Sequence, residues 1–245
     1  YRGMNRINNG TALHYPLPFG DLDYAFGLET PDWEDFGPRP GSTLSDITID
    51  TKLNCGVAFQ TSNDTENLAI ADMSADYCRT IAAAVFYGDY EAVDLLNFSS
   101  IDEAFFALQN GTIDVLAGTN VEKSRDFEGF QFSTPYYYKS GTSREALIAF
   151  AIATREDDSL FSSLVNCVVL ATLYAEESGT LTNQVPFASI FGYEMRWSLR
   201  DAVSYSGPYD MLFKKHFGIG SVRARNGLNR MNEAGPQLHS LPSIE

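Results

Sequence analysis

The 245-residue sequence is poor in basic residues, and this scarcity limits its partners. Only 17 Lys and Arg stand against 32 Asp and Glu, which gives a net charge of −15. Nucleic acids and anionic membrane surfaces are bound by clustered cations, so we expect neither as a partner. Long apolar runs are also lacking. The longest, residues 164–175, is too short to span a bilayer and contains Asn166, so we expect no membrane span.

Residues that commonly carry catalysis are scarce as well. The three histidines, His14, His216 and His239, lie in the tails or at a helix end, where a satisfied or solvated imidazole is the simpler interpretation. The sequence has no Gly-x-Ser-x-Gly elbow, no phosphate-binding glycine loop and no Cys/His group with metal-ligand spacing. We therefore expect a protein that is not an enzyme and holds no cofactor and no metal.

Cysteine is nearly absent, whereas glycosylation motifs are present. The three cysteines, at positions 55, 78 and 167, are compatible with one disulfide and a free thiol, or with three buried thiols. Four Asn-x-Ser/Thr sequons occur, at Asn9, Asn63, Asn97 and Asn110. These sequons predict N-linked glycans and a secreted, extracellular glycoprotein.

Residues 1–41 differ in pattern from the rest of the chain. They combine prolines, scattered aromatic residues and many acids, with neither the helical nor the strand period. This composition predicts an extended N-terminal arm. Because aromatic side chains bury large apolar areas, we expect the arm to lie on a surface, either of a neighbouring copy or of its own chain.

Residues 42–245 alternate between strand and helix patterns, which predicts one α/β domain with a mainly parallel sheet flanked by helices. The expected strands are 53–59, 68–71, 93–96, 112–117 and 147–153. The expected helices are 75–86, 101–109, 159–178, 186–192, 194–204 and 207–217.

Several segments, in this order and spacing, resemble one protein family. Residues 53–57, 76–86, 107–117 and Ser124-Arg-Asp126 are similar to lobe 1 of bacterial periplasmic amino-acid-binding proteins. These are the type II solute-binding proteins of ABC transporters, here of the general L-amino-acid type. The similarity covers about 43–138 and 146–235. It implies a periplasmic-binding-protein-like fold.

The family has two lobes that close on the ligand, and the sequence contains only the first. Where the family inserts lobe 2, the sequence has the loop 139–146. The resemblance places Thr119 and Arg125 at the ligand site, with Arg125 holding the α-carboxylate. A structural role for Arg125, pairing with Asp126 or capping carbonyls, is the alternative. The resemblance also implies a Cys55–Cys78 disulfide with Cys167 free.

A half cleft leaves an amino-acid zwitterion exposed to water, where an ion pair contributes little. We therefore expect a non-enzymatic structural or assembly subunit of an extracellular filament or surface complex, which self-associates through the arm, residues 1–41. The alternative is a small-molecule, amino-acid-like binding protein that retains a half cleft.

Overall fold

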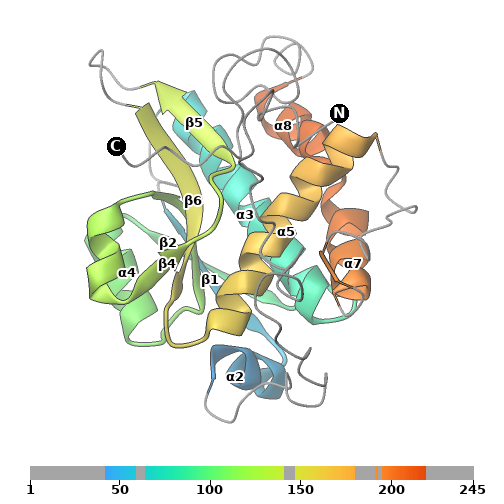
Figure 1. Cartoon of the computed structure of the whole chain (residues 1–245). Coiled ribbons are helices and arrows are strands. Elements are labelled where there is room, and N and C mark those ends of the chain that lie inside the picture. Colours follow the sequence, from blue (N-terminus) through green and yellow to red (C-terminus); the bar gives the residue numbers. More distant parts are fainter. Residues whose placement is uncertain (1–41, 59–63, 141–146, 180–190, 193–194, 219–245) are drawn as a thin grey trace, which may run out of the picture.

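A computed structural model describes residues 42–58, 64–140, 147–179, 191–192 and 195–218. The arm 1–41, the sequons at Asn9 and Asn63, nearly all of the expected helix 186–192, and residues 219–245 lie outside the described residues. The described part forms one sheet with helices on both faces (Figure 1). The expected α/β class is confirmed.

The elements alternate along the chain in the expected manner. In order they are α2 (Thr43–Asp50), β1 (Leu53–Ala58), α3 (Thr65–Val85), β2 (Val93–Phe98), α4 (Ile101–Gln109), β3 (Val115–Asn120), the 3-10 helix η3 (Lys123–Glu128), β4 (Phe130–Phe132), β5 (Tyr137–Ser140), β6 (Leu147–Arg155), α5 (Ser159–Ser178), α7 (Arg196–Ser206) and α8 (Tyr209–Phe217).

Strand β6 is antiparallel to all the other strands described. The strand order is β2-β1-β3-β6-β4, and β5 also pairs with β6. Strands β2, β1 and β3 are parallel, whereas β6 is antiparallel to β3, β4 and β5. Five described strands therefore share one direction, and the sheet is mainly parallel as expected.

Strands β5 and β6 form a hairpin at the place where the second lobe would be inserted. Their register runs from Tyr137↔Phe150 to Ser140↔Leu147. Strand β5 continues two residues into the expected loop 139–146, so the connection consists of residues 141–146. Six residues that join two paired strands leave no room for a second lobe.

The two faces of the sheet pack separate hydrophobic clusters, as alternating side chains require. Val57, Val115 and Ile152 belong to the large cluster shared with α3, α5, α7 and α8. On the other face, Leu116 and Ala153 join the smaller cluster under α4. Gly56 points to this second face, where a Cβ would lie 2.5 Å from the Cδ1 of Ile113.

Helix α3 corrects two sequence predictions. The strand expected at 68–71 is helical, and the helix begins at Thr65 instead of residue 75. The Asp64 carboxylate caps it by accepting from the backbone N–H of Glu66 at 3.0 Å. A four-residue apolar run fits a strand or a buried helix equally well, and the cap at Asp64, four residues before the run, decides for the helix.

Other elements also differ from expectation, most of them by two or three residues at a boundary. Helix α2 was not predicted, although Ser42 caps it by accepting from the N–H of Ser45. Strand β3 begins at Val115, three residues late, and continues past Gly118 to Asn120. Gly118, with φ +77°, carries the register shift against β6, and a Cβ there would lie 2.8 Å from the Ser74 hydroxyl oxygen.

The disulfide implied by the family resemblance is present. Cys55 on β1 and Cys78 on α3 are bonded and tie the first strand to the helix that covers it. Cys167 is the free cysteine of the described residues and is buried in α5. Burial raises the pKa of its thiol to about 12, so it behaves as a small apolar side chain.

Helix α5 contains the segment Ser159–Glu176, which is long and apolar enough to cross a membrane by length and composition. In the folded chain 67% of this segment is buried. It packs on β6, α3, α7 and α8. Its apolar character is that of a core helix.

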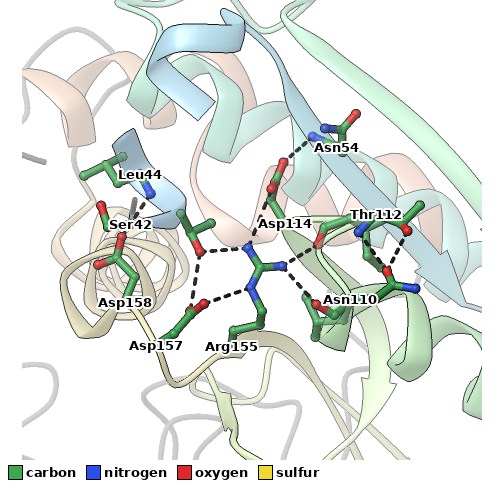
Figure 2. Close-up of polar contacts among 12 residues, drawn as sticks. Ser42, Leu44, Asn54, Asn110, Thr112, Asp114, Arg155, Asp157 and Asp158 are labelled. Carbon is green, nitrogen blue, oxygen red and sulfur yellow. Dashed lines mark hydrogen bonds and ion pairs between the residues drawn. The ribbon is translucent and has the colours of Figure 1, made fainter. Parts of the chain in front are cut away.

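Arg155 ends β6 and joins four separate segments (Figure 2). Its Nη1 donates to the carbonyls of Leu108 at 2.9 Å and Ile113 at 2.8 Å. Its Nη2 donates to the Thr43 hydroxyl at 2.8 Å and lies 3.9 Å from the Asp114 carboxylate. Burial raises the pKa of Asp114, which accepts from the N–H of Asn54. Arg155 thus links the end of the returning strand to α4, to the segment just before β3 and to α2.

We predict that Arg155→Ala lowers the free energy of unfolding by about 2–4 kcal/mol, because two carbonyls lose their donor and the buried Asp114 carboxylate loses the cation beside it. Arg155→Lys keeps the charge but cannot reach all acceptors, so it recovers only part of the loss. Lys52→Ala is the control, since the Lys52–Asp94 pair is exposed and is worth about 0–1 kcal/mol. Equal urea midpoints for the Arg155→Ala and Lys52→Ala variants would show that the network is not needed.

Asp76 on α3 fastens the C-terminal helices. Its side chain is 4% exposed and binds the Nζ of Lys215 and, at 2.8 Å, the Nε2 of His216, both on α8. Arg79 and the hydroxyl of Tyr205 on α7 reach its other oxygen. Burial raises the pKa of Asp76, but the hydrogen bonds from His216 and Lys215 outweigh it and lower the pKa from 3.8 to about 2.

This lowered pKa predicts acid-dependent stability. Asp76 contributes about 2 kcal/mol above pH 4, and the contribution is lost as the pH falls through about 2, because protonation removes the negative charge. The stability difference between the wild type and Asp76→Asn should therefore shrink from pH 5 to pH 2 in urea titrations. Asp94→Asn, at an exposed pair, serves as control. A difference that stays constant with pH contradicts the assignment.

Candidate functional site

The carboxyl edge of the sheet is the candidate site. The parallel strands β1, β2 and β3 end there, at Ala58, Phe98 and Asn120. In open α/β sheets, ligands bind outside this edge. The two ligand residues implied by the family resemblance, Thr119 and Arg125, lie at or just beyond the end of β3.

Thr119 has no exposed surface in the structure. It is paired opposite Ala151 on β6, and its hydroxyl contacts the carbonyl of Asn120 at 3.5 Å. A ligand that arrives from solution does not reach this side chain unless the edge opens. Its role as a ligand residue stays a prediction.

Arg125 is held by three carboxylates of its own chain. Its guanidinium donates to Asp102 at 3.0 Å, Glu122 at 2.9 Å and Glu128 at 3.3 Å. It also lies over the ring of Phe105, 4.0 Å from the centroid. Burial lowers the pKa of Arg125, but the bonds to Asp102 and Glu122 outweigh it, so the pKa is above its ordinary value. The structural alternative for Arg125 named Asp126 or backbone carbonyls as its partners, whereas the guanidinium donates to these other acids.

A second cation at the same edge, Lys139 on β5, is likewise paired. Its Nζ lies 2.7 Å from the Asp64 carboxylate, 2.7 Å from the Asn67 amide oxygen and 3.5 Å from Glu66. The hydroxyl of Tyr137 donates to Glu66 at 2.8 Å. Burial lowers the pKa of Lys139, but the hydrogen bond to Asp64 and the charge of Glu66 outweigh this effect, so the pKa is above its ordinary value. Sequence reasoning missed this residue, which it assigned to a loop.

Among the described side chains that pair at this edge, the carboxylates outnumber the cations. Arg125 and Lys139 stand in two separate groups that together contain five carboxylates, which belong to Asp64, Glu66, Asp102, Glu122 and Glu128. All five carboxylate side chains are at least 40% exposed. An added anion meets cations that are already neutralised, whereas an added cation meets accessible acceptors.

Two of the predicted glycosylation sites are described, and both asparagines are exposed. Asn97 lies near the end of β2. Asn110 follows α4, and its Oδ1 accepts from the N–H of Thr112 at 3.0 Å and from its hydroxyl at 2.6 Å. Glycans at these positions would reach solvent, and their presence stays a prediction. Within the described ranges, no group of three or more His, Cys, Asp or Glu could hold a metal ion.

Comparison with known proteins gives the fold and no family. No family model matches the chain, and no curated protein matches it. An ABC transporter periplasmic binding protein from Brucella ovis with glutathione bound is 18% identical; the match covers 78% of this chain and 95% of that one, with a TM-score of 0.59. The P235GK mutant of ArgBP from T. maritima is 13% identical, with 73% and 100% coverage and a TM-score of 0.44.

The arginine-bound form of domain 1 from TmArgBP is also similar, at 20% identity, with 51% and 96% coverage and a TM-score of 0.37. The match to the Brucella ovis protein shows that this chain shares its fold with a periplasmic binding protein. The expected resemblance is confirmed at the level of the fold.

Proposed function

We propose that this chain is a non-enzymatic binding protein of the solute-binding type, built from one lobe, which takes a small amino-acid-like ligand at the carboxyl edge of its sheet. The fold shared with a periplasmic binding protein supports this function, which we first considered as the alternative. The observation that carries the choice of ligand is the excess of exposed carboxylates around Arg125 and Lys139.

These charges favour a ligand that binds through a cationic group. An α-carboxylate has to displace Asp102, Glu122 or Glu128 from Arg125, and it gains little, because one ion pair replaces another. An ammonium or guanidinium group instead adds to acceptors that are 45–82% exposed. With only one lobe to exclude water, we expect a dissociation constant on the order of millimolar.

A matched ligand pair tests this proposal. We predict saturable binding of both L-arginine and agmatine, its decarboxylated form, and none of glutarate, glutamate or glutathione. Isothermal titration calorimetry at low salt measures this binding. Asp102→Asn or Glu128→Gln should weaken it severalfold, because each substitution removes one exposed negative charge. Asp94→Asn, at the opposite end of β2, is the control variant.

Two results contradict the proposal. Binding of arginine without binding of agmatine shows that the carboxylate is the anchored group. Sub-millimolar binding of glutathione or glutamate shows that an anionic ligand is preferred, as in the Brucella ovis structure with glutathione bound.

A second candidate function is assembly, as a secreted glycoprotein subunit of an extracellular filament or surface complex. The carboxyl edge of the sheet also favours this function, because Arg125 and Lys139 are already paired within the chain and Thr119 is buried, so no side chain there requires a ligand. The Cys55–Cys78 disulfide is typical of secreted and periplasmic proteins. In this function residues 1–41 of one copy bind another copy.

For the assembly function we predict that deletion of residues 1–41 converts associated protein into folded monomers, because the arm supplies the contact. Light scattering coupled to size-exclusion chromatography measures the mass, and circular dichroism checks the fold. A full-length chain that is monomeric at all concentrations, or a truncated chain that stays associated, rules out the arm as connector.

A further inference from the structure

Strand β2 is an open edge of the described sheet. It pairs with β1 along its whole length, from Leu53↔Val93 to Ala58↔Phe98. No strand among the described residues pairs with its other side. The backbone groups on that side are a template for pairing with a strand of another molecule.

The usual protections of an edge strand are weak here. Proteins discourage edge pairing with prolines, bulges and unpaired charges, lysine above all. The sequence of β2, Val-Asp-Leu-Leu-Asn-Phe, contains no proline and one charged residue, Asp94. The Nζ of Lys52 neutralises this carboxylate at 2.8 Å. The strand is six residues long, an ordinary length for pairing.

A glycosylation sequon lies on this same strand. Asn97 begins Asn97-Phe-Ser99, is exposed, and stands opposite Val57 of β1, one residue before β2 ends. Ser99 is exposed as well. The sequon is thus the one bulky, solvent-directed modification that the sequence places on the open edge.

We propose that an N-linked oligosaccharide on Asn97 covers the open edge of β2 and prevents strand pairing between copies. The proposal rests on the secreted setting of the assembly function and is independent of solute binding. A large hydrated glycan at the end of a short strand sterically excludes a second strand. It takes over the protective role of the Asp94 charge, which Lys52 neutralises.

The modification requires a donor of known chemical class. A lipid pyrophosphate carries the oligosaccharide, and its anomeric carbon forms a bond to the Asn97 Nδ2. The bond between that carbon and the pyrophosphate oxygen breaks. The amide nitrogen gives up one proton, and the lipid pyrophosphate leaves with the bonding electrons, so no oxidant or reductant is consumed.

The sequon at Asn110 provides the comparison site. Asn110 is exposed like Asn97, but it lies in the turn after α4 and not on a strand. Its glycan, if attached, covers no sheet edge. Loss of the Asn110 glycan should therefore leave association unchanged.

The experiment expresses the full chain in a eukaryotic secretory host and compares two variants at one residue. Ser99→Ala removes the sequon but keeps Asn97, whereas Ser99→Thr keeps the sequon. Glycopeptide mass spectrometry reads occupancy, and light scattering reads mass against concentration. We expect occupancy at Asn97, at least a doubling of the average mass for Ser99→Ala, and wild-type behaviour for Ser99→Thr and Asn110→Gln.

Hydrogen exchange identifies the contact, since the amides of β2 should be more protected in associated Ser99→Ala protein than in the wild type. Equal association of Ser99→Ala and Ser99→Thr overturns the proposal. A glycan on Asn110 with a bare Asn97 overturns it also, but leaves the secreted setting intact. Absence of glycans from all four sequons overturns both the proposal for Asn97 and the secreted setting.

Discussion

The pairing of β6 on both of its sides is the constraint on which the rest of the structure depends. This strand runs against five others, lies between β3 on one side and β4 and β5 on the other, and ends at Arg155. Its first half closes a hairpin in place of a second lobe. Its last residue binds the end of α4 and Ile113, two residues before β3 begins. A chain without lobe 2 keeps a complete sheet because the returning strand is fastened at both ends.

The presence of a single lobe also explains the charges at the carboxyl edge of the sheet. A two-lobed binding protein leaves the edge of its first lobe to a ligand and a second lobe. Here Arg125 on η3 and Lys139 on β5 are neutralised by acids from the nearest helices and turns, so neither cation depends on a ligand. The surplus carboxylates remain in water, where their desolvation cost is small. The exposed carboxylates around Arg125 and Lys139 are the basis of the proposal that cationic groups bind here weakly.

Sequence reasoning succeeded where the pattern is local and failed where the structure is decided by distant residues. Strand β1 and helices α4 and α5 follow from apolar periodicity with capping residues, and the Cys55–Cys78 bond followed from the family resemblance. The predicted start of α3 was wrong, because its capping residue, Asp64, precedes the apolar run 68–71, which fits a strand and a helix equally well. The continuation of β3 past Gly118 to Asn120 involves the bulge opposite β6. The partners of Arg125 come from α4 and from η3 with its N-cap, and no spacing rule connects Asp102 to residue 125.

Native-state hydrogen exchange tests most directly whether one lobe, closed by β6, is a complete folding unit. The account predicts that the amides of β5 and β6 exchange only through global unfolding, with the same free energy as those of β3 and as urea denaturation. It is contradicted if the β5–β6 hairpin exchanges orders of magnitude faster than β3 under the same conditions. That result would mean that the returning strand is held loosely and that the sheet needs a second lobe or another copy to be complete.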